Sequence, residues 1–306
     1  MADWDSLSGE EVTERFAGVT VWKDGAQRAP HKPLLILLTL ARLQRGGANS
    51  ASFAEINQPL KTLLQDFGPS RKSYHPEYPF WHLQSDGLWV IPEREALDRD
   101  LARRRRQNNP PKGVLLDANA HGGFPSALAN RLKSEPALVN RITQRILDDN
   151  FPQSAQQDLL DAVGMPWVQP ALKRRRDPAF RDTILRIYEH RCAVCGYDAM
   201  LGNTSLGIEA AHIRWHAAGG PDSEVNGLAL CSLHHKALDR GAIGLDEGNR
   251  ILVSQHVRGS HGVEEWLNRF SGQGLRGPQP GCSGPALEYV RWHQAEVFRG
   301  PARASG

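Results

Sequence analysis

The apolar positions in the first half of the chain recur mainly at helical spacing. The run PLLILLTLARLQR at residues 33–45 opens with a proline, which suits a first helical turn, and a Gly-Gly pair follows it. The segment FAEINQPLKTLLQDF at residues 53–67 is amphipathic and is followed by a Gly-Pro pair. Both patterns predict a helix that ends at a glycine.

Two further segments complete this half. The segment YHPEYPFWHLQSDGLWVI at residues 74–91 has an Asp-Gly pair between apolar runs, which favours a β-hairpin. Residues 126–164 predict two or three helices, the last of which ends at Gly164. The first half is therefore expected to be helical with a small sheet.

Helical and strand patterns alternate in the second half. The predicted elements are a helix at 179–191, a strand at 207–215, a helix from about residue 232, a hairpin at 242–254 and a helix at 283–298. The strand candidate runs into a glycine-rich loop, AAGGPDSEVNG. The chain as a whole is predicted to be mixed α/β, of the α+β type.

A non-periodic stretch separates the two halves. MPWVQPALKRRRDP, residues 165–178, contains three prolines and a basic run. We interpret residues 166–177 as a linker between domains at 1–165 and 178–306. A length of 306 residues is enough for two domains with separate cores.

Charge and hydropathy narrow the class of protein. The 37 Lys+Arg exceed the 34 Asp+Glu only slightly, but basic residues cluster at 103–106 and 173–176. Such runs either neutralise DNA phosphates or form solvated loops. No apolar run reaches the roughly 18 residues of a membrane span, and the N-terminus is acidic and polar. A cytoplasmic protein without membrane contact is expected.

Two short pairs of metal-ligating residues lie in the second half, CAVC and CSLH. Their four members are Cys192, Cys195, Cys231 and His234. Three thiolates and one imidazole form the closed donor set of a structural Zn²⁺ site, which leaves no position for catalysis. The fourth cysteine of the chain, Cys282, lies far downstream and is interpreted as a lone thiol.

A second histidine follows directly after this pair. If His234 completes the zinc site, then His235 points elsewhere, and Asp239 shares its helix face at i,i+4. An imidazole and a carboxylate suit a harder ion such as Mg²⁺ or a transition metal. By itself this pair is weak evidence, because similar pairs occur by chance on helix surfaces.

The ordered motifs CAVC, EAAHI, DSEVNGLALC and SLHHKALD resemble the HNH nuclease motif in its ββα-metal form. The similarity covers about residues 178–300, and HHKALDRGAIGLDE and WHQAEVF are similar to McrA-like restriction endonucleases. The resemblance implies that His212 is the general base for a water, that Asn226 holds its orientation, and that His235 binds a catalytic Mg²⁺, Mn²⁺ or other divalent ion.

One position departs from this family. Many members have His or Asp immediately before the base, but here that residue is Ala211, which cannot bind a metal. The expected ligands are therefore His235 and Asp239. Glu209 is an alternative, although it lies three residues before His212 and should point to the other face of a strand.

The first half shows a second resemblance. APHKPLLILL, FGPS, HPEYPFWHLQSDGLW and NAHGGF, within residues 10–165, are similar to the sulfur-binding domain that recognises phosphorothioate-modified DNA. The resemblance implies that His31, Lys32, Tyr78 and Pro79 line a pocket for the sulfur, with His82 as a neighbour, and that the run at 103–106, through Arg104 or Arg105, contacts DNA.

Such a pocket has a physical rationale. Sulfur is larger and a poorer hydrogen-bond acceptor than the oxygen it replaces, so a rigid apolar cup beside cationic phosphate contacts would select it. The alternative for the aromatic residues is packing, and we expect Trp81 and Trp89 to belong to the core.

Together these features predict a modification-dependent type IV restriction endonuclease. It would recognise phosphorothioated double-stranded DNA and hydrolyse phosphodiester bonds nearby. Cutting both strands needs two sites, so a homodimer is expected. The alternatives are an HNH endonuclease directed at modified cytosine and a non-catalytic DNA-binding module.

Overall fold

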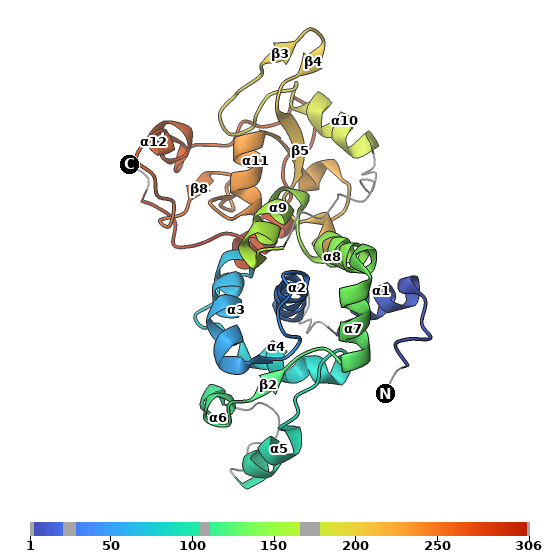
Figure 1. Cartoon of the computed structure of the whole chain (residues 1–306). Helices are drawn as coiled ribbons and strands as arrows, with labels where there is room; N and C mark the ends of the chain where they lie inside the picture. Colours follow the sequence, from blue (N-terminus) through green and yellow to red (C-terminus); the bar gives the residue numbers. More distant parts are fainter. Residues whose placement is uncertain (1–2, 21–28, 104–110, 166–177, 305–306) are drawn as a thin grey trace. The chain divides into compact units, whose positions relative to one another are not determined.

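The computed structural model describes residues 3–20, 29–103, 111–165 and 178–304 (Figure 1). The chain divides into two compact units, Met1–Asn150 with Gln156–Ala171, and Phe151–Ala155 with Leu172–Gly306. The linker expected at 166–177, and also Arg104 and Arg105, lie outside the described residues. Within the described ranges, no helix combines the length and apolar character needed to cross a membrane.

Helices build the first unit. They are α1 Gly9–Ala17, α2 His31–Gln44, α3 Phe53–Phe67, α4 Glu77–His82, α5 Arg94–Arg103, α6 Lys112–Asp117, α7 Ser126–Ser134 and α8 Pro136–Asn150, and α9 Gln153–Val163 follows at the division between the units. Two short strands, β1 Ala51–Ser52 and β2 His121–Gly122, pair antiparallel. The helices predicted at 33–45, 53–67 and 126–164 are confirmed.

Helix α2 is the centre of this unit (Figure 1). It packs against α3, α4, α7 and α8, and every residue from Pro33 to Ala41 is buried. An almost continuous apolar run suits a helix surrounded on all sides, whereas α3 shows the one-sided pattern of a helix at the edge of a core. Glycine ends α3, with Gly68 as its C-cap.

The hairpin predicted at 74–91 is wrong. This segment instead forms α4 and a following 3₁₀ turn, η1 Leu83–Asp86. Gly87 adopts φ 73° and ends the turn, while the Asp86 carboxylate accepts hydrogen bonds from Lys32 Nζ at 2.6 Å and Thr20 N at 2.8 Å. The Asp-Gly pair therefore ends a helical segment, because distant partners hold Asp86 and glycine tolerates the left-handed conformation.

The aromatic residues of this segment behave as expected. Trp81 and Trp89 are 5% and 3% exposed, which confirms them as core residues. Phe80 packs edge-on against both Phe53 and Trp89. Tyr78, by contrast, is 38% exposed.

The second unit is built on a ββα element. Strand β5 Ile208–His212 pairs antiparallel with β6 Gly227–Cys231, and α11 Ser232–Asp239 follows directly. Helix α10 Pro178–Ile187 packs on β5 and β6, as does α11, so both strands are largely buried. The expected α+β class and ββα arrangement are confirmed.

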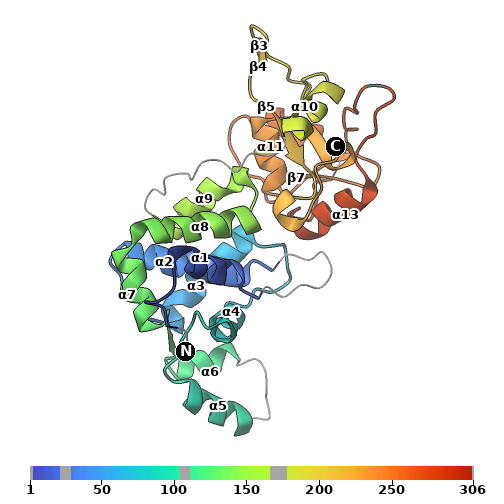
Figure 2. The ribbon, with the colours of Figure 1, turned by 90° about the vertical axis from the view of Figure 1, so that its right-hand side faces the viewer.

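The second unit also contains short strands, 3₁₀ turns and helices outside the ββα element. They are β3 Met200–Leu201, β4 Thr204–Ser205, η2 His216–Ala218, η3 Glu224–Asn226, β7 Ile243–Leu245, β8 Ile251–Val253, α12 Val263–Trp266, η4 Asn268–Phe270 and α13 Leu287–Glu296. Strands β7 and β8 form the predicted hairpin, and Figure 2 shows β3 and β4 projecting from the rest of this unit.

Strand register decides which residues meet at the ends of the hairpin. His212 lies opposite Gly227 and Ile208 lies opposite Cys231. The loop between the strands therefore returns beside His212, whereas Cys231 and the start of α11 lie at the other end. A Cβ at Gly227 would overlap the side chain of Ile184, so glycine permits α10 to pack closely on β6.

Candidate functional site

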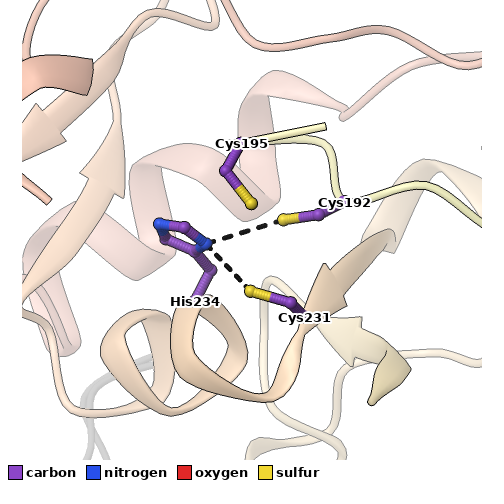
Figure 3. A group of neighbouring side chains, drawn as sticks. All are labelled: Cys192, Cys195, Cys231 and His234. Atoms are coloured by element: carbon purple, nitrogen blue, oxygen red, sulfur yellow. Dashed lines mark hydrogen bonds between the residues drawn. The ribbon is translucent and has the colours of Figure 1, made fainter. Parts of the chain in front are cut away.

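Three cysteines and one histidine converge beside α11 (Figure 3). They are Cys192, Cys195, Cys231 and His234, and their ligand atoms all lie within 4.8 Å of one another. His234 Nδ1 faces the sulfurs, at 3.0 Å from Cys231 Sγ and 3.6 Å from Cys192 Sγ. This is the group that the two short sequence motifs predicted.

Contacts around the cluster orient its donor atoms toward one another. His234 Nε2 lies 2.8 Å from the carbonyl oxygen of Trp266 and donates to it, which leaves the Nδ1 lone pair directed at the sulfurs. The backbone N–H of Ala193 donates to the carbonyl of Ala229 at 2.8 Å, so the cysteine turn is tied to β6. Three sulfurs and one imidazole nitrogen, largely removed from water, fit Zn²⁺.

Electrostatics in the cluster favour the thiolate at Cys192, whereas hydrogen bonds with Cys192 and Cys195 raise the pKa of the Cys231 thiol. Hydrogen bonds from Cys195 and Cys231 lower the pKa of the Cys192 thiol. Burial opposes the charged form of His234, but hydrogen bonds with Cys192 and Cys195 raise its pKa to about 9. A cation entering this group would displace these protons, which is how thiolate sites couple metal binding to pH.

His235 has entirely different neighbours. It is 5% exposed, and its Nδ1 lies 2.6 Å from Glu209 Oε2 while its Nε2 lies 3.2 Å from Asp239 Oδ2. Burial opposes the charged ring, but the carboxylates of Asp239 and then Glu209 raise the pKa of His235 to about 9. The imidazole is thus held between two carboxylates, one on each ring nitrogen.

This group offers a divalent cation one ring nitrogen and one carboxylate at a time, because its two carboxylates lie on opposite ring nitrogens. Its donors are one imidazole nitrogen and carboxylate oxygens, the set that Mg²⁺ and Mn²⁺ accept. A cation bound through one ring nitrogen of His235 leaves the other nitrogen to donate to a carboxylate, which orients the ring. Asp239 is buried and Glu209 has a half-exposed side chain that also accepts from Ser232 Oγ at 2.8 Å.

His212 lies at the end of β5 and is 7% exposed. Its ring stacks on Phe180, with centroids 4.1 Å apart and planes inclined by 14°. Its Nε2 lies 2.7 Å from Asp222 Oδ1. Asp222 was not among the residues predicted from the sequence; its signal is an acidic residue in the loop that must return to His212.

Asn226 is fully buried and bonds to the loop backbone. Its Oδ1 accepts from Arg214 N at 2.8 Å, and its Nδ2 donates to the carbonyls of Arg214 and Pro221 at 3.0 Å each. Within the described residues, the Asn226 side chain therefore bonds to the loop backbone instead of to the imidazole, the expected partner. Asn226 fixes the loop, and Asp222 contacts the ring.

In the first unit, α2 and α4 pack together and carry the residues predicted to bind the sulfur. Tyr78 stacks on His75, with centroids 4.7 Å apart and planes inclined by 12°, and Pro79 is buried. His82 lies at the end of α4 and is partly buried. The ring of Tyr78 is thus held rigidly while remaining accessible.

The two basic residues at the start of α2 are more constrained than the sequence suggested. The ammonium of Lys32 is paired with Asp86 at 2.6 Å, and their side chains are only 13% and 7% exposed. Burial lowers the pKa of His31, and the nearby charges of Arg71 and His75 lower it further. His31 therefore favours the neutral form.

Comparison with known proteins identifies both halves. The sequence model of the ScoMcrA-like DNA sulfur-binding domain matches residues 9–167, and that of an HNH endonuclease family matches residues 192–246. No curated protein matches the chain.

Several solved structures are also similar to parts of the chain. The sulfur-binding domain of ScoMcrA complexed with phosphorothioated DNA is 21% identical, with 50% of this chain and 94% of that chain covered and a TM-score of 0.43. The corresponding SprMcrA domain is 20% identical, covering 53% and 96%, with a TM-score of 0.41. The modification-dependent TagI restriction endonuclease is 25% identical, covering 44% and 41%, with a TM-score of 0.31.

The first family match spans just over half of the 306 residues, and the second contains His212, Asn226 and His235. The chain joins a DNA sulfur-binding domain to an HNH endonuclease domain, and it belongs to the ScoMcrA-like DNA sulfur-binding domain family.

Proposed function

We propose that this chain is a type IV restriction endonuclease that binds phosphorothioated double-stranded DNA and cleaves it nearby. The observation that carries the proposal is the joining of the two family matches in one chain, with a ββα element that carries His212 and His235. The relatives complexed with phosphorothioated DNA support the choice of substrate. Since this substrate is intracellular DNA, the proposed location is the cytoplasm.

In the proposed reaction, His212 takes a proton from water at Nδ1, and the water oxygen attacks phosphorus. The bond from phosphorus to the 3′ oxygen breaks, which leaves a 5′-phosphate and a 3′-hydroxyl whose proton comes from solvent. His235, with Asp239 or Glu209, would hold a divalent cation such as Mg²⁺ or Mn²⁺, which would supply positive charge at the scissile phosphate. Zn²⁺ at the cysteine cluster has a structural role.

Sulfur recognition is assigned to the surface around Tyr78 and Pro79. The exposed Tyr78 ring, held by its stack on His75, offers a rigid apolar contact. Burial lowers the pKa of His31, so its ring favours the neutral form and adds little positive charge beside this contact. His82, Lys32, Arg104 and Arg105 are proposed to lie near the bound DNA, as in the sequence prediction.

The proposed oligomeric state rests on the need to cut both strands of the duplex. One HNH site cuts one strand at a time, so cleavage of both strands calls for two sites facing opposite strands. We therefore propose a two-fold homodimer on DNA.

The proposal is tested by comparing one duplex with and without a single phosphorothioate linkage, together with a third that carries methylated cytosine. We expect the sulfur-containing duplex to bind at least about tenfold more tightly, about 1.4 kcal/mol, and to be the one cleaved. Equal affinity for the sulfur-containing and ordinary duplexes contradicts sulfur recognition. Preference for the methylated duplex supports the cytosine alternative instead.

Tyr78→Ala sharpens this test. The variant should lose the preference for sulfur while cleaving whatever DNA it binds, because the HNH site is unchanged. Tyr197→Ala is the matched control, since Tyr197 is 40% exposed against 38% for Tyr78 but belongs to the second unit. Retained discrimination in Tyr78→Ala removes this residue from the proposed pocket.

A further inference from the structure

A close contact between an imidazole and a carboxylate in the second unit joins His212 to Asp222. We infer that Asp222 is a positioning residue, which holds the His212 imidazole in the tautomer whose Nδ1 is unprotonated. This inference rests on the proposed nuclease function, in which His212 is the general base. It assigns to Asp222 a role that neither the sequence motifs nor the family matches give it.

The geometry places the carboxylate on one defined ring nitrogen. Asp222 Oδ1 lies 2.7 Å from His212 Nε2, a normal length for a charge-assisted hydrogen bond. The imidazole side chain is 7% exposed and that of Asp222 is 28% exposed, so the bond lies at the edge of the protein interior. The stack on Phe180 restricts rotation of the ring, so the ring and the carboxylate meet in one orientation.

The chemistry of the carboxylate decides the tautomer. An ionised carboxylate can only accept hydrogen bonds, so the proton of a neutral His212 must reside on Nε2. The lone pair then resides on Nδ1, the nitrogen that takes a proton from water in the proposed reaction. Once Nδ1 is protonated, the positive charge of the imidazolium develops beside the negative charge of Asp222, which stabilises it.

The backbone of the loop that carries Asp222 is constrained by hydrogen bonds and close contacts. Pro221, directly before Asp222, is held through its carbonyl by Asn226 Nδ2 at 3.0 Å. The preceding Gly220 N donates to the carbonyl of Trp215 at 2.9 Å, and a Cβ at Gly220 would overlap the carbonyl oxygen of Arg214. The tight backbone therefore fixes the start of the Asp222 side chain. In this arrangement Asn226 acts on His212 through the position of Asp222.

The tautomer can be observed without substrate. Long-range proton–nitrogen spectra of the zinc-loaded full chain, labelled with ¹⁵N at histidine, distinguish the two neutral tautomers. The His212 signals are assigned as those lost in His212→Ala, and spectra are recorded at a pH where the ring is neutral. We expect wild-type His212 to carry its proton on Nε2. A proton on Nδ1 in the wild type overturns the inference.

Asp222→Asn is the decisive variant, because an amide can present an N–H to Nε2 and so favour the opposite tautomer. We expect its His212 signals to shift toward the Nδ1-protonated form. Glu224→Gln, in the same loop, removes the same charge and should leave the tautomer unchanged. A shift of equal size in both variants shows a general charge effect and overturns the inference.

Single-turnover cleavage gives the second measurement. Asp222→Asn should cleave about 10²–10⁴-fold more slowly, with unchanged zinc content, melting temperature and DNA affinity, whereas Glu224→Gln should cleave at the wild-type rate. Restoration of the Asp222→Asn rate by excess Mg²⁺ would make Asp222 a metal ligand and overturn the positioning role. If the wild type cleaves no DNA, the nuclease proposal fails. The tautomer measurement still decides whether Asp222 sets the tautomer of His212.

Discussion

His234 and His235 are neighbours on α11, yet they belong to two chemically different regions. Both are buried, and the pKa of each is raised to about 9. His234 faces the sulfurs of the cysteine cluster, whereas His235 lies between the carboxylates of Glu209 and Asp239. The two histidines are thus alike in burial and in pKa, but the donor atoms around them differ: sulfur for His234 and carboxylate oxygen for His235.

Helix geometry and donor softness explain the difference. Successive side chains on a helix diverge by about 100°, so adjacent histidines cannot share one small site. Thiolates select a soft or borderline cation such as Zn²⁺, while carboxylates accept Mg²⁺ or Mn²⁺. Two adjacent histidines can therefore serve one ion that holds the fold and another that takes part in the reaction, without competition between them.

The largest effect is expected from Cys192→Ser. Removing a thiolate from a closed zinc site should release the metal, and structural zinc contributes on the order of 10 kcal/mol to folding in small sites. We expect zinc content to fall toward zero and the second unit to melt first in calorimetry. Cys282→Ser is the control, because it makes the same exchange at a partly buried cysteine outside the cluster. A zinc-loaded Cys192→Ser of normal stability contradicts the cluster.

His212→Ala tests whether cleavage can be lost while the fold and the zinc site are kept. Loss of the general base should reduce the single-turnover cleavage rate by about 10²–10⁴-fold, with zinc content and melting temperature near those of the wild type. DNA affinity, measured by fluorescence anisotropy, should change little. A large loss of affinity would show that His212 mainly binds DNA and would contradict its role as base.

Replacing each of the two neighbouring histidines in turn tests the difference between them most directly. His235→Ala should retain zinc but bind Mn²⁺ more weakly, as measured by electron paramagnetic resonance, and cleave about 10–100-fold more slowly or worse. His234→Ala should instead lose zinc. If both variants lose zinc, the two histidines belong to one site, and the division proposed here is wrong.

The smallest effect concerns His31, a partly buried histidine near the charges of Arg71 and His75. Burial lowers its pKa below the usual 6.5, the reverse of His234 and His235. Folding therefore favours neutral His31: its contribution to stability is present above pH 6.5 and is lost as pH falls through the folded-state pKa. Melting curves between pH 7 and about pH 5 should show a smaller pH-dependent loss in His31→Gln than in the wild type. An equal loss in both proteins excludes His31 as a contributor.

The sequence alone predicted those features that depend on local spacing. Helices α2 and α3, the hairpin of β7 and β8, and the four members of the cysteine cluster follow from periodicity and from short paired motifs. The motifs also placed His212 on a strand and His235 on the helix after it. These features were accessible because each helix, hairpin or pair of ligands depends on residues close to one another in the chain.

Only the tertiary structure decided which distant side chains meet. The Asp86-Gly87 pair ends a helical segment because Lys32 and Thr20 reach Asp86 from elsewhere in the chain. Asp222 meets His212 because antiparallel pairing and a tight loop return the chain to the end of β5. Spacing specifies the elements and the candidate ligands, whereas strand register and packing, which sum many weak contacts over long separations, decide which carboxylate each histidine receives.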